Sequence, residues 1–245
     1  MQQARKTALV TGASRGIGAA IALRLARDGF SVAANYASGT READAVVDDI
    51  VAAGGQAFAV QADLGKAEDT ERLFDAVNSR FGSLDVVVHN AGIQLLGSHA
   101  EMEVAALDRL IEINLTAAFR VLSRAARQVS EGGRIIALSS GTTAVLPPRY
   151  DVYAATKAAV EVLIGVLAKE LRGRGITANA IAPGPVATDL YLKGKTATEL
   201  EETAARTPLG RIGQPNDIAG TIAFLAGPGG EWINGQTILV NGGMI

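Results

Sequence analysis

The sequence contains no cysteine, and this one absence excludes several kinds of chemistry. Its 245 residues include no cysteine and only two histidines. A chain without thiols forms no disulfide, no thiolate metal site and no cysteine nucleophile, which is typical of a reducing compartment. Two isolated histidines make no metal-ligand cluster, so we expect no catalytic metal ion.

An excess of charge of either sign is also missing. Lysine and arginine total 23 and aspartate and glutamate 25, which leaves a formal net charge of −2. Nucleic-acid-binding proteins usually carry a clear basic excess, so no nucleic-acid partner is expected. Apolar residues make up 48% of the chain, which excludes a disordered protein, and aromatic residues only 4%. The core must therefore be built from alanine, valine, isoleucine and leucine.

Long apolar runs are absent as well. Only a short apolar stretch precedes Thr11, whereas a signal peptide needs about 7–15 apolar residues. The densest apolar segment, residues 158–168, is interrupted by Glu161 and Gly165. It is also shorter than the roughly 20 residues of a membrane-spanning helix. We therefore expect a cytoplasmic protein without a membrane partner.

What the sequence does contain is an alternation of short β-branched runs and alanine-rich helical stretches. This alternation predicts βαβ units and a parallel sheet with helices on both faces. We predict one α/β domain over residues 1–245, a doubly wound Rossmann fold with about seven parallel strands. Strands are expected at 7–10, 31–35, 57–61, 85–89, 134–138, 176–181 and 237–240, and helices at 16–28, 40–53 (with Thr40 as its N-cap), 66–81, 103–129 and 153–172.

A glycine-rich turn follows the first predicted strand. The sequence TGASRGIG places Gly12, Gly16 and Gly18 where the strand turns into the first helix. A helix N-terminus presents free N–H groups to a phosphate, and glycine lets the backbone approach a pyrophosphate closely. The turn therefore predicts a dinucleotide site; a tight turn without a ligand is the alternative.

The end of the second strand bears on the choice between NAD and NADP. An acidic residue about 20 residues after the turn normally binds the ribose 2′-hydroxyl of NAD. Here the strand ends in Asn35-Tyr36-Ala37-Ser38, and the first acidic residue is Glu42. Arg15 and Ser38 can instead hold a 2′-phosphate, with Arg41 as a weaker candidate. We therefore predict that NADP(H) is preferred over NAD(H).

A tyrosine and a lysine stand four residues apart at the start of a predicted helix. Tyr153 and Lys157 share a face of that helix. An ammonium near a phenol lowers the phenol's pKa from about 10, and such a tyrosine exchanges a proton with a carbonyl or alcohol oxygen. This pair alone is common on exposed helices. The polar residues Ser139-Ser140 and Asn90, however, follow strands at the same predicted sheet edge.

Together these motifs resemble the short-chain dehydrogenase/reductase family in its single-domain form. The resemblance covers essentially the whole chain: TGASRGIG, the NAG at residues 90–92, a helical Asn114, Ser140, Tyr153-x-x-x-Lys157 and PGPVAT occur in the family's order. It implies an oxidoreductase acting on CH–OH groups. It also implies that Ser140 holds the substrate oxygen, Tyr153 is the acid/base, Lys157 binds the nicotinamide ribose, and Asn114 holds a water that links Lys157 to solvent.

The resemblance also assigns the remaining cofactor contacts. It implies that Asn90 lies near the ribose, that Asp63 and Leu64 lie near the adenine, and that the segment from Pro183 to Thr188, with Ile17, shapes the nicotinamide pocket. The expected cofactor-binding set is Gly12, Ser14, Arg15, Gly16, Ile17, Gly18, Asn35, Tyr36, Ala37, Ser38, Asp63, Leu64, Asn90, Ala91, Gly92, Tyr153, Lys157, Pro183, Gly184, Val186 and Thr188.

Two histidines need an explanation of their own. His89 stands before the NAG motif, where the family often has asparagine, and we expect its ring to be hydrogen-bonded locally at the strand end. His99 lies in a polar loop and is expected to be solvated.

The substrate is less well defined than the reaction. The loops expected around the pocket are largely apolar, which suits a hydrophobic or acyl-type ketone; simple loop packing is the alternative. Residues 185–210 are expected to form a lid over the substrate. The predicted pocket residues are Gln94, Thr142, Leu146, Tyr150 and Leu190.

Within the family, the chain looks most like the 3-oxoacyl-[acyl-carrier-protein] reductases. An acidic carrier protein would need a basic docking patch, for which Arg124, Arg127, Arg172 and Arg174 are candidates. The turn at residues 130–133 is not basic, so a dehydrogenase of a small free alcohol, polyol, sugar or steroid remains an alternative. A non-enzymatic cofactor sensor or scaffold is the remote alternative, which we would expect to lack Tyr153 or Lys157.

The predicted helix at 153–172 carries an argument about assembly. Residues 158–168 are apolar almost all the way round, although a helix on a sheet needs only one apolar stripe. A symmetric partner is the simplest way to bury the other side. The family resemblance implies a homotetramer, with the segment 241–245 at a second interface.

Overall fold

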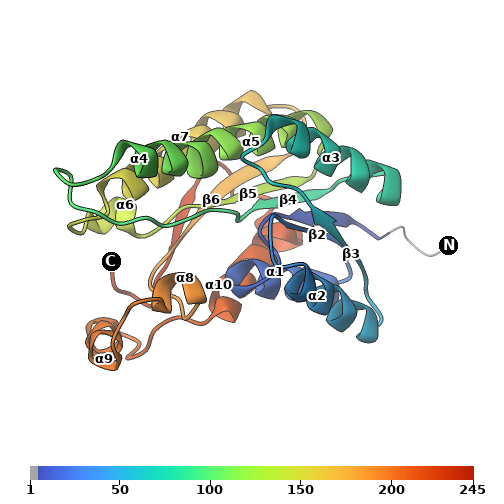
Figure 1. The fold of residues 1–245 in the computed structure, drawn as a ribbon. Helices are drawn as coiled ribbons and strands as arrows, with labels where there is room; N and C mark the ends of the chain where they lie inside the picture. The colour runs from blue at the N-terminus through green and yellow to red at the C-terminus, as the bar shows by residue number, and fades with distance from the viewer. Residues whose placement is uncertain (1–4) are drawn as a thin grey trace.

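The computed structural model describes residues 5–245, and its centre is a seven-stranded sheet. The strand order is β3-β2-β1-β4-β5-β6-β7, and every neighbouring pair is parallel. Helices cover both faces, which confirms the predicted doubly wound fold (Figure 1). The strands are β1 (Thr7–Val10), β2 (Ser31–Tyr36), β3 (Gln56–Gln61), β4 (Val86–His89), β5 (Arg134–Leu138), β6 (Thr177–Pro183) and β7 (Thr237–Val240).

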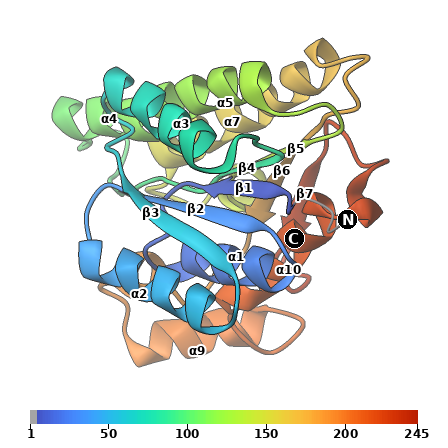
Figure 2. The same cartoon turned by 90° about the vertical axis from the view of Figure 1, so that its right-hand side faces the viewer.

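The helices form two layers on the sheet, as Figures 1 and 2 show from perpendicular directions. One layer contains α1 (Gly16–Arg27), α2 (Thr40–Ala52) and α10 (Pro215–Ala226). The other contains α3 (Ala67–Phe81), α4 (Val104–Leu110), α5 (Ala117–Gln128) and α7 (Asp151–Glu170). Short helices complete the chain: α6 (Thr142–Val145), α8 (Asp189–Leu192), α9 (Ala197–Arg206) and the 3₁₀ turn η2 (Pro228–Gly230).

Alternate residues of each strand feed two separate cores. On β1, Leu9 packs with α3, α5 and α7, whereas Ala8 and Val10 pack with α1 and α10. All three side chains are fully buried, as expected for a parallel strand covered on both faces. Aliphatic residues dominate both cores, with Phe74 the largest fully buried side chain. Because aromatic side chains are few, closely packed aliphatic side chains fill both cores instead.

The predicted long helix over 103–129 is interrupted by a π-helical turn. The structure divides the segment into α4, the π turn η1 (Ile111–Thr116) and α5. A π turn inserts extra backbone into a helix and occurs frequently at functional sites. Asn114 lies within this turn and is buried. Hydrophobic periodicity does not reveal such an insertion, because the flanking turns keep their apolar face.

Helix boundaries differ from the predictions by one or two residues. Gly39, with a φ of 84°, occupies the N-cap position of α2, so the prediction of Thr40 as the N-cap is wrong. The left-handed backbone at this point favours glycine, and Thr40 becomes the first helical residue. Two prolines stand at helix ends: α9 ends just before Thr207-Pro208, and α10 begins at Pro215.

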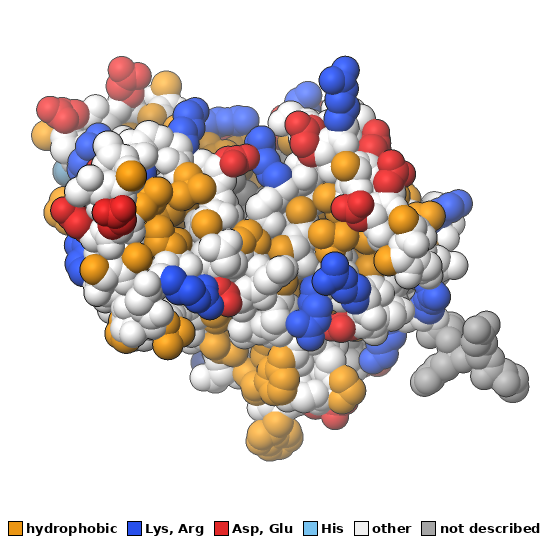
Figure 3. All heavy atoms as spheres, turned by 90° about the horizontal axis from the view of Figure 1, so that it is seen from below, with side chains coloured by type: hydrophobic (Ala, Val, Ile, Leu, Met, Phe, Trp, Pro, Cys, Tyr) orange, Lys and Arg blue, Asp and Glu red, His pale blue; other side chains and the backbone are white. Residues whose placement is uncertain are grey.

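Helices α8 and α9 lie away from the sheet, at the same edge as α6 (Figure 1). The C-terminus lies between α6 on one side and α8 and α9 on the other. This places the predicted lid beside the carboxyl ends of the strands. On the face seen in Figure 3, acidic, basic and apolar side chains are interspersed, and no large area carries charge of a single sign. Within residues 5–245, no helix combines the length and hydropathy needed to cross a bilayer.

Candidate active site

A cavity of about 660 Å³ opens at the carboxyl edge of the sheet, between β4, β5, β6 and the α8–α9 segment. Ligands of open α/β sheets bind at this edge. Many of the predicted site residues line it, namely Ile17, Asn90, Gly92, Gln94, Ser140, Thr142, Tyr150, Tyr153, Lys157, Pro183, Gly184, Val186, Thr188 and Leu190. The structure therefore brings together residues that are up to about 170 positions apart in the chain.

The glycine turn after β1 is held tightly to the end of β4. The Asn90 amide donates to the carbonyls of Thr11 and Gly12, each at 3.0 Å. A β-carbon at Gly18 would lie 2.1 Å from the Gly12 carbonyl oxygen, so no other residue fits there. No side chain of the described residues caps α1, and its first turn contains no acidic residue. The first N–H groups of α1 therefore have no side-chain acceptor within residues 5–245, and such a helix N-terminus can bind a phosphate.

The end of β2 divides into buried and exposed residues. Asn35 is buried, and its amide donates to the carbonyls of Val60 (3.3 Å) and Ala62 (3.1 Å), while its oxygen accepts from Gly12 N–H (3.4 Å). Its contacts thus join β2 to β3 and to the glycine turn. Tyr36 is likewise buried. The predicted phosphate ligands Arg15 and Ser38, and also Arg41, are exposed.

One acidic side chain does lie close to this corner. Oε2 of Glu42 lies 3.0 Å from the place of a β-carbon at Gly39, next to Ser38. Glu42 belongs to the first turn of α2, where a carboxylate is favoured by the helix dipole. Asp63 and Leu64 follow β3 at the same edge; Leu64 is buried, and the Asp63 carboxylate accepts from Gly65 N–H at 3.1 Å. Of the remaining predicted contacts, Ser14, Ala37 and Ala91 belong to the loops after β1, β2 and β4, and Gly16 is the first residue of α1.

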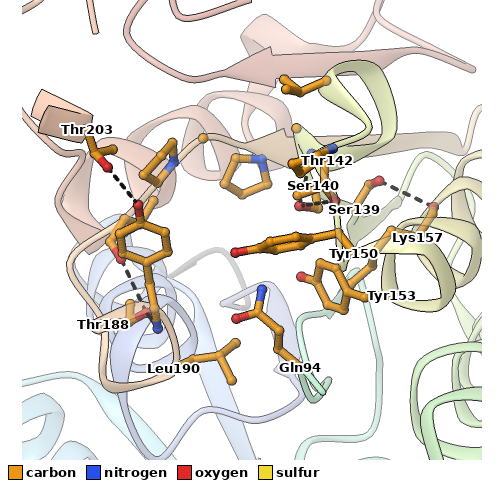
Figure 4. Close-up of a pocket in the computed structure, with 18 of the residues that line it drawn as sticks. Gln94, Ser139, Ser140, Thr142, Tyr150, Tyr153, Lys157, Thr188, Leu190 and Thr203 are labelled. Atoms are coloured by element: carbon orange, nitrogen blue, oxygen red, sulfur yellow. Dashed lines mark hydrogen bonds between the residues drawn. The ribbon is translucent and has the colours of Figure 1, made fainter. Parts of the chain in front are cut away.

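Three of the four predicted catalytic side chains, Ser140, Tyr153 and Lys157, converge on the cavity (Figure 4), whereas Asn114 does not line it. Tyr153 and Lys157 lie on the first turns of α7, and Ser140 follows β5; all three are buried. The Thr142 hydroxyl donates to Ser140 Oγ at 2.9 Å. Because that bond uses a lone pair of Ser140, its own proton stays free for a ligand. The Lys157 ammonium donates to the Leu138 carbonyl at 2.9 Å.

The electrostatics differ from the expected lowering of the tyrosine pKa by Lys157. Burial raises the pKa of Tyr153 to about 12, and the nearby Ser140 hydroxyl offsets only part of this rise. Burial also lowers the pKa of Lys157 to about 8. Lys157 Nζ lies 6.0 Å from the centre of the Tyr153 ring, and its ammonium is bound to the Leu138 carbonyl. Desolvation therefore outweighs charge attraction, and the Tyr153 phenol is protonated at neutral pH.

Asn114 uses its amide to fix the loop after β4. Its oxygen accepts from Ile93 N–H and its nitrogen donates to the Ile93 carbonyl, both at 2.9 Å. A β-carbon at Gly92 would lie 3.2 Å from Asn114 Oδ1 and 3.4 Å from Lys157 Nζ. Glycine at this position therefore lets the loop pass between the two side chains. The water relay suggested for Asn114 remains a prediction.

His89 is hydrogen-bonded through only one of its ring nitrogens. Nδ1 lies 3.2 Å from Oγ1 of Thr11, a hydroxyl that already accepts from Asn90 and Ala91 N–H. The Thr11 proton thus goes to Nδ1, which assigns the ring proton to Nε2. Nε2 is buried without a partner among residues 5–245. Burial lowers the pKa of His89 to about 3, so the ring is neutral.

His99 is exposed, as predicted, but it also contacts the start of α7. Its Nδ1 lies 2.6 Å from Oδ2 of Asp151, the first residue of that helix. This hydrogen bond lowers the pKa of the Asp151 carboxyl below its usual range. The contact joins the loop after β4 to the helix that carries Tyr153.

The substrate side of the cavity departs from prediction at one residue. Gln94, Thr142, Tyr150 and Leu190 line it as expected, whereas Leu146 does not. Leu146 has a φ of 51° at the end of α6 and its side chain is 70% exposed, because the left-handed turn directs it outward. The predicted lid at 185–210 contributes further lining residues, Tyr191, Lys195, Glu199, Glu202, Thr203 and Arg206. Met244 and Ile245 also line the cavity, and no sequence pattern indicated them as pocket residues.

Comparison with known proteins agrees with this geometry. A family model described as Enoyl-(Acyl carrier protein) reductase matches residues 12–245. A 3-oxoacyl-[acyl-carrier-protein] reductase of Staphylococcus aureus is 46% identical over 242 residues, which cover 98% of each chain. An NADPH-dependent aldehyde reductase-like protein of Arabidopsis thaliana is 41% identical over 256 residues, covering 99% of this chain and 95% of the relative.

Solved structures are similar over the same length. A short chain dehydrogenase from Burkholderia cenocepacia, determined in complex with NADP, superposes with a TM-score of 0.93 at 38% identity and covers 99% of both chains. Sequence motifs, sheet order and site geometry thus lead to one assignment. The chain belongs to the short-chain dehydrogenase/reductase family of oxidoreductases.

Proposed function

We propose that the protein is an NADP(H)-dependent carbonyl reductase whose substrates are free ketones or aldehydes with apolar substituents. The observation that carries the proposal is the buried Tyr153, whose pKa is raised to about 12 by burial, beside Ser140 in a cavity lined by both apolar and polar side chains. A carbonyl oxygen placed between these hydroxyls would receive a hydrogen bond from one and a proton from the other.

The chain offers a fitting site for the dinucleotide. The glycine turn supplies backbone N–H groups for the pyrophosphate, and Arg15 and Ser38 are exposed where a 2′-phosphate would lie. The NADP bound to the Burkholderia cenocepacia relative and the name of the Arabidopsis thaliana relative support the same choice. When bound, the dinucleotide supplies the hydride, while the protein supplies orientation and the proton.

The protein's own part of the reaction is proton delivery. Ser140, whose Oγ accepts from Thr142, donates a hydrogen bond to the substrate oxygen and keeps its proton, which orients the carbonyl. Tyr153 then gives its proton to the same oxygen as negative charge develops there. The ammonium of Lys157, on the same face of α7, stabilises the resulting phenolate while it is charged, which its pKa of about 8 allows at neutral pH.

The cavity walls favour apolar substituents and one further polar group. Val145, Pro147 and Leu190 supply apolar surface. The carboxamide of Gln94 and the hydroxyl of Tyr150 point into the same space in Figure 4. A ketone with a second oxygen near the reacting carbonyl, such as a β-keto ester, would match this arrangement, because a site that hydrogen-bonds a polar group of its substrate disfavours analogues that lack the group.

A 3-oxoacyl thioester on a carrier protein is the second candidate, favoured by the similarity to the Staphylococcus aureus reductase. The four arginines considered for docking do not all offer free charge. Arg124 pairs with Glu71 (3.2 Å) and Asp75 (2.8 Å), and Arg174 pairs with Glu131 (2.8 Å). Internal pairing weakens an acidic partner's attraction, so we place free substrates first.

Assembly as a homotetramer is part of the proposal. On α7, Val162 is 66% and Val166 is 49% exposed, and Phe119 on α5 is 56% exposed. Apolar side chains so exposed on two helices of one layer suit a symmetric helix interface. Sedimentation analysis should give a tetramer, and a monomer at micromolar concentration would contradict this part.

An absorbance assay of NADPH and NADH oxidation tests the proposal. The panel contains a simple aliphatic ketone, a β-keto ester, a 3-oxoacyl thioester both free and on its carrier protein, and a sugar. We expect NADPH-dependent reduction of the first two. Faster turnover of the carrier-bound thioester would favour the second candidate, and NADPH binding without turnover of any carbonyl would favour a cofactor sensor.

The nucleotide preference has its own variant. Arg15→Ala should lower kcat/KM for NADPH roughly tenfold and leave that for NADH within about twofold, because only NADPH carries the 2′-phosphate. Arg27→Ala, an exposed arginine at the far end of α1, is the matched control. A wild-type preference for NADH would overturn the assignment of Arg15 and Ser38.

A further inference from the structure

A carboxylate lies behind the serine turn, outside the motifs discussed so far. Glu161 is on α7, and Tyr153, Lys157 and Glu161 follow one another at intervals of four along that helix. One oxygen of Glu161, Oε1, lies 2.5 Å from Ser139 Oγ and 2.9 Å from Thr143 Oγ1. The helix that carries the acid/base is thus bonded to the segment after β5.

These two contacts lie on either side of Ser140. Ser139 also bonds through its N–H to the Ile181 carbonyl at 2.7 Å, which fixes the start of the turn on β6. At its end, Thr143 Oγ1 lies 2.9 Å from the Ser140 carbonyl as well as from Glu161. One carboxylate oxygen therefore holds the residues before and after the serine that orients the substrate.

We propose that Glu161 is a positioning residue, which fixes the Ser139–Thr143 turn and thereby the direction of the Ser140 hydroxyl relative to Tyr153. Glu161 does not line the cavity and contacts no reacting group. Its effect passes through Ser140, because it accepts hydrogen bonds from Ser139 and Thr143, which stand before and after that serine in the turn. The inference rests on the proposed reductase function, in which Ser140 binds the substrate oxygen.

The strength of this support follows from the charge of the acceptor. Hydrogen bonds to a carboxylate are shorter and stronger than those between neutral groups. Glutamine would keep a neutral carbonyl acceptor at the same place, whereas alanine would remove it. Displacement of a positioned group by about 1 Å can cost about a hundredfold in rate.

The first measurement is therefore the steady-state kinetics of reduction. Glu161→Ala should lower kcat about 10- to 100-fold and leave KM for NADPH within about twofold. Glu161→Gln should recover most of the loss. Glu170→Ala, at the exposed end of the same helix, is the matched control and should behave as wild type.

A double-mutant cycle separates positioning from general damage to the fold. In a Ser140→Ala background, Glu161→Ala should change kcat by less than about twofold, because the group that it positions is gone. An equally large loss in both backgrounds would overturn the proposal, since it would show that Glu161 does not act through Ser140.

Crystal structures of the wild type and Glu161→Ala give a second readout that does not depend on turnover. The proposal predicts that Ser140 Oγ leaves its contact with Thr142 in the variant. An unchanged Ser140 would overturn the inference even if the enzyme is active. A displaced Ser140 in a protein that reduces no carbonyl would uphold the positioning contact and refute the proposed function instead.

Discussion

The wall that carries Tyr153 and the predicted lid at 185–210, across the cavity from it, are built in opposite ways. Ser140, Tyr153 and Lys157 are all less than 10% exposed, and backbone or side-chain hydrogen bonds fix the segments that carry them. Across the cavity, Leu190 is 52% exposed, and Tyr191 is linked to Thr203 by a bond of 3.4 Å. The two regions share one cavity but differ in how firmly they are held.

This difference separates two properties of the enzyme. In the proposed reaction the proton donor, Tyr153, is positioned by many mutual contacts, so we expect the buried wall to set the type of reaction. We expect the choice of substrate to depend on a few exposed side chains of α8 and α9, which can change without disturbing the core. Substitutions in the wall should therefore abolish chemistry, and those in the lid should alter preference.

The strongest expected effect is on the wall. Tyr153→Phe removes the proton that the substrate oxygen receives, and kcat for reduction should fall about 10²- to 10⁴-fold. The affinity for NADPH, measured by fluorescence titration, should stay within about twofold. Comparable turnover by the variant would mean that another group delivers the proton.

Lys157 should reveal a conflict between activity and stability. Its ammonium is buried, and the folded-state pKa of about 8 lies below the ordinary value of 10.5. Lys157→Met should therefore lose most activity while gaining about 1–3 kcal/mol in free energy of unfolding at pH 7. Urea denaturation measures this gain, and a variant less stable than wild type would contradict it.

The same shift predicts a pH dependence. Between pH 8 and 10.5 the unfolded chain holds the Lys157 proton more firmly than the folded protein does, so the lysine's contribution to stability rises with pH in this window. Lys157→Met should lack that rise. Identical slopes for the two proteins would show that burial does not govern this lysine.

His89 should govern the acid side of the stability curve. Its folded-state pKa of about 3 lies below the ordinary 6.5, so the unfolded state binds the proton first and stability falls as pH drops from 6.5 towards 3. His89→Asn removes the titrating ring and should flatten this decline by an amount on the order of 3 kcal/mol. Thermal unfolding at pH 7 and pH 4 compares the two, and parallel declines would refute the assignment.

The smallest effect on stability is expected in the lid. Leu190→Ala should change the free energy of unfolding by less than about 0.5 kcal/mol, because the side chain is largely exposed. It should nevertheless change the ratio of kcat/KM for long and short ketones several-fold. A change in rate that is equal for all substrates would mean that Leu190 does not contact them.

Much of the sheet, and of the wall that carries Tyr153, was predictable from the sequence. The strands 7–10, 134–138 and 237–240 match their predicted bounds, because β-branched runs between turn residues are local signals. The order and spacing of the motifs also predicted that Ser140, Tyr153 and Lys157 lie at one sheet edge, and in the structure all three line one cavity. These features depend on short-range patterns or on the order of strands, which a single sequence contains.

What remained hidden depends on tertiary context. The π turn around Asn114 leaves the apolar pattern of its helix unchanged. The rise in the Tyr153 pKa comes from burial, and residue spacing alone predicted the opposite direction. Glu161 looked like an interruption of an apolar helix until its partners Ser139 and Thr143 were placed beside it. Each of these features is set by neighbours that are distant in the chain.

The most direct test of the account is the fate of a labelled hydride. NADPH carrying deuterium at both positions of the reactive nicotinamide carbon is incubated with the wild type and an apolar ketone, and the product is analysed by mass spectrometry and NMR. The account predicts an alcohol with one deuterium on the carbinol carbon, formed about 10²- to 10⁴-fold more slowly by Tyr153→Phe. An unlabelled alcohol, or no alcohol from any ketone of the panel, would contradict it.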